Sequence, residues 1–316
     1  MKYLITGANG FVGTNLCRYL AEKGHECLTL DIGDADYGWD ELGRIPFGEI
    51  DCVVHLAGKA HDLKKVASER SYFDINVGLT QKIYEAMRER VESERRDEVE
   101  KVGGGGERKF IYFSSSKASK EGNAYGRSKF AAEEWLKEQY LHCPPPPHFS
   151  TFVLRPAMIH GPGNKGNLNL LWGVARRGVP WPLATFENHR SFTSIGNICA
   201  AVEALSTRTA DGGGTPSLPV FEVADDEMLS TNRLIELIAE ACGRKARLWR
   251  LPKGLMRCVA RIGDILHLPL NTERIEKLTE DSFVDNSALK AFLGWEKMPI
   301  GAEEGMKRTL ESFGKK

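Results

Sequence analysis

Residues 1–13, MKYLITGANGFVG, predict the fold of the chain. A short apolar stretch leads to Gly7, Gly10 and Gly13, and the residues that follow place Leu16 and Leu20 on one face of a helix. Glycines at this spacing allow a tight turn and let a pyrophosphate approach the N–H groups at the helix N-terminus. We therefore expect a dinucleotide-binding βαβ unit. Its turn should line the cofactor with Gly7, Asn9, Gly10, Phe11, Val12 and Gly13.

The second predicted strand, ECLTLD, ends at Asp31, eighteen residues after Gly13. A carboxylate at this place can accept hydrogen bonds from the ribose hydroxyls of the adenosine, and it repels a 2′-phosphate. Asp31 therefore favours NAD over NADP as the cofactor.

Residues 108–129, RKFIYFSSSKASKEGNAYGRSK, run from an apolar strand through three serines to a Tyr-x-x-x-Lys step. On a helix, Tyr125 and Lys129 share one face. The ammonium group should then lower the pKa of the phenol and make Tyr125 a usable proton-transfer group. A hydroxyl at the end of the strand would hold the reacting oxygen. The serine run leaves Ser115 and Ser116 as alternatives for that role.

Several ordered motifs resemble those of the extended short-chain dehydrogenase/reductase family. They are TGANGFVG at 6–13, DCVVHLAG at 51–58, the serine pair, YGRSK at 125–129 and LRPAMIHGPG at 154–163. The similarity is greatest to bacterial nucleotide-sugar epimerase/dehydratase members that act in surface-polysaccharide synthesis. It extends over nearly the whole chain.

The resemblance implies an α/β fold, a doubly wound parallel (Rossmann) sheet with a smaller, mainly helical C-terminal substrate lobe. We expect the NAD-binding domain over residues 1–163, completed by about 190–225. Residues 164–189 and 226–316 would then form the substrate lobe.

The resemblance also implies further site residues. Lys129 would hold the cofactor ribose, and Asn76 would order the neighbouring helix and a water near the active site. The cofactor-lining set would include Leu56, Ala57, Gly58, Asn76, Pro156 and Ile159. Asn167, Leu168, Arg190 and Arg274 would bind the substrate, although plain surface arginines remain an alternative.

The expected function is NAD-dependent 4-epimerisation of a hexose that is linked to a nucleotide or polyprenyl diphosphate, through a 4-keto sugar. Ser116 and Lys117 stand where the family's dehydratases carry an Asp-Glu pair, which argues against dehydration. A 4-keto-sugar reductase using NAD(P)H and a non-catalytic dinucleotide sensor are the alternatives. The loop between Ser115 and Tyr125 is shorter than in relatives, so another segment has to exclude water.

Composition excludes several other classes. The 316 residues carry 43 cationic and 43 anionic side chains, so we expect no nucleic-acid partner. The seven cysteines form no C-x-x-C pair, which indicates reduced thiols, no metal site and a cytoplasmic protein. The first predicted strand begins at residue 2, and we expect neither a signal peptide nor a membrane-spanning helix.

Residues 247–271 combine basic and apolar side chains, with apolar positions three and four apart. Such a helix face either docks on the substrate lobe or makes peripheral contact with a membrane or a polyprenyl carrier. The Tyr-Lys helix offers Phe130, Trp135 and Leu136 for a homodimer, but packing in the core explains them equally well.

Overall fold

The computed structural model describes residues 1–60, 68–98, 107–142, 148–164, 167–208, 218–266 and 271–314. The chain divides into two compact units. Unit 1 comprises Met1–Pro156, Ile198–Val223 and Ser287–Gly294, and unit 2 comprises Ala157–Asn197, Ala224–Asn286 and Trp295–Lys316.

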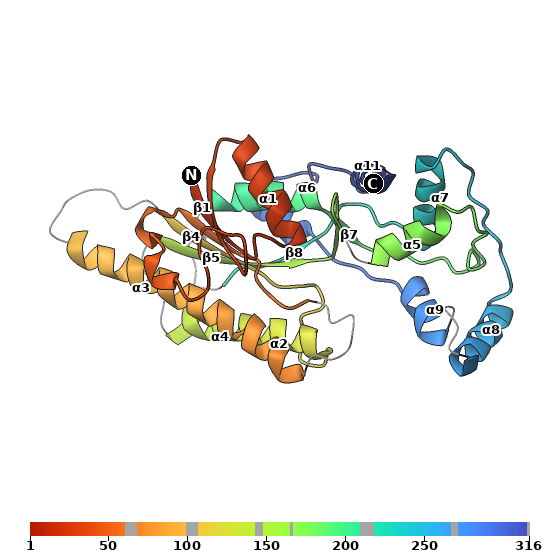
Figure 1. Cartoon of the computed structure of the whole chain (residues 1–316), viewed down its shortest axis with the longest axis horizontal. Helices are drawn as coiled ribbons and strands as arrows, with labels where there is room; N and C mark the ends of the chain where they lie inside the picture. Colours follow the sequence, from red (N-terminus) through yellow and green to blue (C-terminus); the bar gives the residue numbers. More distant parts are fainter. Residues whose placement is uncertain are drawn as a thin grey trace. The chain divides into compact units, whose positions relative to one another are not determined.

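Unit 1 is built on a six-stranded parallel sheet, which confirms the predicted doubly wound fold (Figure 1). The spatial order of the strands is β2-β1-β3-β4-β5-β8, so the direction of winding reverses between β1 and β3. Ligands of such sheets bind beyond the carboxyl ends of the strands at this reversal. The strands are β1 (Lys2–Thr6), β2 (Glu26–Leu30), β3 (Cys52–His55), β4 (Arg108–Phe113), β5 (Phe149–Pro156) and β8 (Val220–Val223).

The central strands are buried on both faces because helices cover the sheet from two sides. In Figure 1, α1 (Phe11–Glu22) and α6 (Ile195–Ser206) lie on one face, and α2 (Glu69–Asn76), α3 (Gly78–Glu98) and α4 (Ala124–His142) lie on the other. Tyr84 of α3 packs edge-on against Phe110 of β4 and Trp135 of α4. Leu136 is fully buried in this core, so it is not available for a dimer contact. Two short 3₁₀ turns, η1 (Leu42–Arg44) and η2 (Phe47–Glu49), precede β3.

Helix α10 (Ser287–Leu293) belongs to unit 1, whereas the sequence interpretation placed all of 226–316 in the substrate lobe. The reason is apolar packing against the outer strands. Phe292 contacts the rings of Phe152 and Phe221, with centroids 5.7 Å and 5.0 Å away. Leu289 is fully buried.

Unit 2 contains a two-stranded parallel sheet and several helices around an apolar core. Its elements are β6 (Met158–His160), β7 (Phe192–Ser194), α5 (Asn167–Ala175), α7 (Thr231–Ala241), α8 (Lys253–Leu266), α9 (Thr272–Thr279) and α11 (Ala302–Gly314). Buried His160 hydrogen-bonds to Thr309 at 2.9 Å and to Asp225 at 3.3 Å. These contacts make His160 a packed residue of this unit.

None of the helices in the described ranges combines the length and the apolar character that crossing a bilayer requires. Within the same ranges, no group of His, Cys, Asp and Glu side chains is arranged to hold a metal ion.

We expect Leu289→Ala to lower the free energy of unfolding by about 2–5 kcal/mol, because it leaves a cavity between α10 and the sheet. Chemical denaturation would measure the loss, and exposed Lys297→Ala is the control, with a change within about 0.5 kcal/mol. Equal stabilities of the two variants would contradict the placement of α10 in the core of unit 1.

Candidate active site

The turn after β1 has the backbone geometry that a dinucleotide needs. Gly7 has a φ of +70°, and a Cβ atom there would lie 2.7 Å from the backbone nitrogen of Ala57. A Cβ atom at Gly13 would lie 2.4 Å from the carbonyl oxygen of Gly7. Only glycine fits at these two positions, so the start of α1 can lie tightly against β1.

The N-terminus of α1 is open to an anion. Gly10 occupies the N-cap without a side-chain hydrogen bond, and the first turn holds no acidic residue. The first-turn amides of Phe11, Val12 and Gly13 have no partner within the helix, and they point out of its positive end. This arrangement fits a pyrophosphate, as the glycine spacing predicts.

Asp31 lies beside the glycine turn at the end of β2. Its Oδ2 accepts a hydrogen bond from the backbone N–H of Asn9 at 2.7 Å, and its Oδ1 accepts one from Ile32 N–H at 2.7 Å. The half-buried carboxylate is therefore held in a fixed position, where it can accept from ribose hydroxyls and repel a 2′-phosphate.

The residues after β3 approach α2 and α4 closely. A Cβ atom at Gly58 would lie 2.8 Å from Oδ1 of Asn76 and 3.2 Å from Nζ of Lys129. Asn76 is fully buried; it accepts from Lys59 N–H at 2.7 Å and donates to Ser128 Oγ at 2.8 Å. The Asn76 amide thus links the segment after β3 to α4 and holds the two in a fixed relative position.

Lys129 is almost fully buried on α4, where Asn123 caps the helix by accepting from Gly126 N–H at 2.9 Å. The Lys129 ammonium donates to the carbonyl of Phe113 at 2.7 Å and lies 4.9 Å from the centre of the Tyr112 ring. Burial lowers the pKa of Lys129 to about 8, while the charge of Glu133 acts in the opposite direction.

The pKa of Tyr125 is shifted in the direction opposite to the one that the sequence predicts. Burial raises the pKa of Tyr125, and a hydrogen bond with Ser115 partly offsets this rise. The ammonium of Lys129 is instead bound to the Phe113 carbonyl. In the free protein the phenol is therefore neutral at ordinary pH, and the predicted lowering by Lys129 is wrong for this state.

The structure distinguishes the three serines. Ser114 donates to the carboxylate of Glu133, and the backbone N–H of Ser116 donates to Pro156 O at 3.0 Å. Ser115 Oγ accepts from Lys117 N–H at 3.2 Å, and this hydroxyl lowers the pKa of Tyr125. Of the two candidate hydroxyls, Ser115 is the one that this arrangement pairs with the tyrosine.

Sequence reasoning missed Glu133, one turn beyond Lys129 on α4. Its buried carboxylate accepts from Ser114, the residue after β4, and from the guanidinium of Arg155 of β5, whose Nε lies 2.9 Å from Oε1. Glu133 therefore fastens the helix to two strands and raises the pKa of Lys129 against burial. The spacing of Tyr125, Lys129 and Glu133, four residues apart each time, was the available signal.

The predicted substrate residues lie in unit 2. Leu168 is buried in the core of this unit, and the side chain of Asn167 lies outside the described residues. Arg190 donates to the carbonyl of Lys277 in α9 at 2.9 Å, and burial lowers its pKa. Exposed Arg274 is part of the first turn of α9. One of the two arginines therefore contacts this helix, and the other belongs to it.

The remaining predicted cofactor residues are Leu56, Pro156 and Ile159, and half-buried Leu56 directly follows β3. Pro156 is buried at the end of β5 in unit 1, and half-buried Ile159 belongs to β6 in unit 2.

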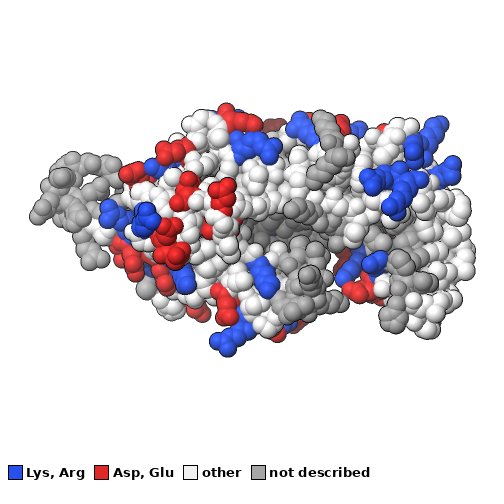
Figure 2. Space-filling model, in the orientation of Figure 1, with Lys and Arg blue, Asp and Glu red and all other residues white. Residues whose placement is uncertain are grey.

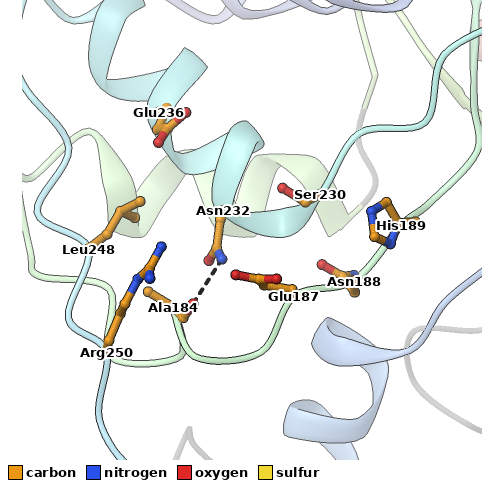
Figure 3. A pocket seen from close by; sticks show the side chains of 9 residues that line it. All are labelled: Ala184, Glu187, Asn188, His189, Ser230, Asn232, Glu236, Leu248 and Arg250. Carbon is orange, nitrogen blue, oxygen red and sulfur yellow. Dashed lines mark hydrogen bonds between the residues drawn. The ribbon is translucent and has the colours of Figure 1, made fainter.

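Unit 2 also contains a polar pocket of about 270 Å³ (Figure 3). At the centre of the pocket, Asn232 donates a hydrogen bond to the carbonyl of Ala184 at 3.1 Å. The side chains of Glu187, Glu236 and Arg250 lie around this contact. None of the residues that line the pocket was predicted as a site residue.

Comparison with known proteins identifies relatives over the whole chain. The model of the NAD dependent epimerase/dehydratase family matches residues 3–214. A UDP-glucose 4-epimerase of Vibrio cholerae is 26% identical over 343 residues, covering 98% of this chain and 94% of the relative. An N-acetyl-alpha-D-glucosaminyl-diphospho-ditrans,octacis-undecaprenol 4-epimerase of Escherichia coli O157:H7 is 27% identical over 340 residues, with coverages of 98% and 94%.

Among solved structures, the UDP-N-acetylglucosamine 4-epimerase from Bacillus cereus superimposes with a TM-score of 0.69 at 18% identity. The match covers 98% of each chain. At this identity the likeness supports the fold alone.

We predict opposite effects of alkaline pH on cofactor affinity and on stability. NAD affinity should fall as pH rises through about 8, because Lys129 loses its charge there. Folding stability behaves oppositely. Between pH 8 and the ordinary lysine value of 10.5 the unfolded chain binds more protons, so the burial penalty, on the order of 3 kcal/mol, disappears as pH rises.

Titration of NAD binding, and denaturation of the wild type against Lys129→Met, from about pH 7 to about pH 10 would measure both effects. Lys129→Met should remove the pH dependence of affinity. A stability difference between the two proteins that does not change with pH would contradict the lowered pKa.

We further expect Glu133→Gln to move the midpoint of the affinity loss to lower pH, because it removes the negative charge that holds the proton on Lys129. Glu134→Gln, the neighbour on the more exposed side of α4, is the control and should leave the midpoint unchanged. An unshifted midpoint in Glu133→Gln would show that the carboxylate does not act on Lys129.

Proposed function

Because this chain belongs to the NAD dependent epimerase/dehydratase family, we propose that it epimerises C4 of a hexose carried on a diphosphate. The chain is an NAD-dependent enzyme, and the glycine turn, the open helix end and fixed Asp31 fit that cofactor. The observation that carries the proposal is the position of buried Lys129, one helical turn beyond Tyr125, with its ammonium 2.7 Å from the carbonyl of Phe113 and next to Gly58 in the loop after β3.

In this mechanism Tyr125 first releases its phenol proton to solvent, and the phenolate then takes the proton of the C4 hydroxyl while the C4–H bond breaks and C4 becomes a ketone. The chemistry that bound NAD supplies is acceptance of the C4 hydride and its return. Ser115 donates a hydrogen bond to the C4 oxygen in both states, which stabilises the charge that develops on it. After the 4-keto sugar has turned over, Tyr125 returns its proton to the oxygen, and the hydrogen on C4 has changed face.

Two features of this chain act in opposite directions on the pKa of Tyr125. Burial raises the pKa, and Ser115 lowers it in part, so we expect the phenolate to form only when the cofactor and the substrate are bound. Lys129 holds a positive charge one turn away, and we expect it to hold the ribose. Helix α4 keeps both groups in register because Glu133 binds it to β4 and β5.

Asp31 favours epimerisation over the alternative, a keto-sugar reductase. An epimerase needs oxidised NAD retained in the site, whereas many biosynthetic reductases take up NADPH. The carboxylate of Asp31 lies where a 2′-phosphate would approach, and two backbone N–H groups hold it there. It therefore disfavours NADPH.

The proposed substrate carries its hexose on a nucleoside diphosphate or on a polyprenyl diphosphate, since the two epimerase relatives act on these two kinds of carrier. Arg190 and Arg274, with Asn167 and Leu168, are the proposed binding residues. A guanidinium group suits a diphosphate because its planar fork donates two parallel hydrogen bonds.

We expect Tyr125→Phe to reduce turnover by about 10²–10⁴-fold, because the proton acceptor is lost, while NAD still binds. The assay is a proton NMR time course with UDP-N-acetylglucosamine, in which the galacto anomeric signal appears. If Tyr125→Phe retained the turnover of the wild type, proton transfer by Tyr125 would be contradicted. If the wild type is inactive as well, the same assay is repeated with the undecaprenyl-diphosphate sugar.

The two serine candidates provide a matched pair for the same assay. Ser115→Ala should lose about 10²–10³-fold in turnover because an oxyanion donor is removed. Ser116→Ala should stay near the wild type. Equal losses in the two variants would contradict the assignment of Ser115.

A further inference from the structure

Helix α8 (Lys253–Leu266) exposes an apolar row that unit 2 leaves uncovered. Its inner face is a narrow strip of small or flexible residues, Met256, Ala260 and Gly263, and all three are buried. A second row on the same helix consists of large aliphatic residues. Their exposed fractions are 51% for Leu255, 40% for Val259, 54% for Ile262, 76% for Ile265 and 61% for Leu266.

This row is unusual because its spacing is regular. Leu255, Val259, Ile262 and Leu266 are separated by four, three and four residues, which places them along one line of the helix. Single exposed apolar residues are normal on a protein surface, but a continuous strip of this kind marks a contact surface. Trp249, 54% exposed just before α8, adds an aromatic ring.

The surroundings of this row are strongly cationic. Between Arg244 and Arg261 the sequence has seven Lys and Arg residues and no Asp or Glu, although charges balance over the whole chain. Lys253, Arg257 and Arg261 form a third row on α8, four residues apart, and all three are exposed. Figure 2 shows an uncharged end where Figure 1 places α8, with Lys and Arg side chains gathered towards α7.

The single carboxylate of α8 is already engaged. Asp264 accepts from the backbone N–H of Thr272 at 3.0 Å and from its hydroxyl at 2.5 Å. These hydrogen bonds lower the pKa of Asp264, so its exposed carboxylate stays negative. Asp264 lies three residues beyond Arg261 and continues the cationic row. With Lys253, Arg257 and Arg261, helix α8 still carries more positive than negative charges.

We propose that α8 docks on the surface of an anionic lipid bilayer. The two rows flank the outward side of α8 and lie about half a turn apart around the helix. The aliphatic row would enter the boundary between headgroups and acyl chains, and the long cationic side chains on the other flank would reach the lipid phosphates. A helix of fourteen residues is about 21 Å long, so it lies along the membrane without crossing it.

Charge argues against a second copy of this chain as the occupant. A two-fold contact through α8 would bring two such cationic segments together, and like charges across an interface are unfavourable. An anionic bilayer complements both rows at once. The inference concerns binding alone and stands beside the proposed reaction, whichever carrier the sugar has.

Flotation of the full chain with lipid vesicles tests the proposal. Vesicles with about one third phosphatidylglycerol should carry the protein upward, and vesicles of phosphatidylcholine alone should carry much less. Ile262→Asn with Ile265→Asn should reduce binding to anionic vesicles at least about tenfold at any salt concentration. Arg257→Glu with Arg261→Glu should reduce it at least about 25-fold, from roughly fivefold for each charge removed.

Two variants on other exposed surfaces are the matched controls. Leu141→Asn, at a residue 60% exposed near the end of α4, and Lys137→Glu, on the same helix, should float like the wild type. Because all the changed residues are exposed, the variants should keep the wild-type unfolding midpoint, and circular dichroism checks this.

Three results would overturn the proposal. The wild type does not float with anionic vesicles; the α8 variants float as well as the controls; or the variants change the sedimentation coefficient of the lipid-free protein, which would assign the row to a second copy. Turnover is measured separately. Flotation without turnover contradicts the proposed reaction alone, and turnover without flotation contradicts the docking alone.

Discussion

The site depends on keeping a lysine charged in a place that water barely reaches. Burial alone would remove the proton from Lys129. The carbonyl of Phe113, which accepts a hydrogen bond from the ammonium, and the negative charge of Glu133, one turn further along α4, both favour the charged form. Glu133 is itself balanced by Arg155 and Ser114. The ion pair between Glu133 and Arg155 links α4 to β5 and therefore helps to fix the position of Tyr125 on α4.

The parts of this arrangement that the sequence predicted are those with a local cause. Gly13 is needed because the nearby carbonyl of Gly7 leaves no room for a Cβ atom, and Tyr125 and Lys129 share a face because of the helical repeat. The strands of the sheet have continuous apolar runs. Such features depend on residues close together in the chain, so motif and period suffice to find them.

Features that depend on distant residues were not predictable in the same way. The partner of Lys129 depends on how β4 lies under α4, and the direction of the Tyr125 pKa depends on burial by the whole unit. The three serines differ only in which way each points from the strand end. Helix α10 has an ordinary sequence, and only the packing of Phe292 on Phe152 and Phe221 assigns it to the sheet.

The return of α10 to unit 1 also bears on how the protein is made. The chain passes between the two units five times, and the last piece of unit 1, residues 287–294, is synthesised after most of unit 2. Until α10 is synthesised, β5 and β8 are not covered by it, and the rings of Phe152 and Phe221 lack their contact with Phe292. The sheet can therefore complete its core only after residues 287–294 have been synthesised.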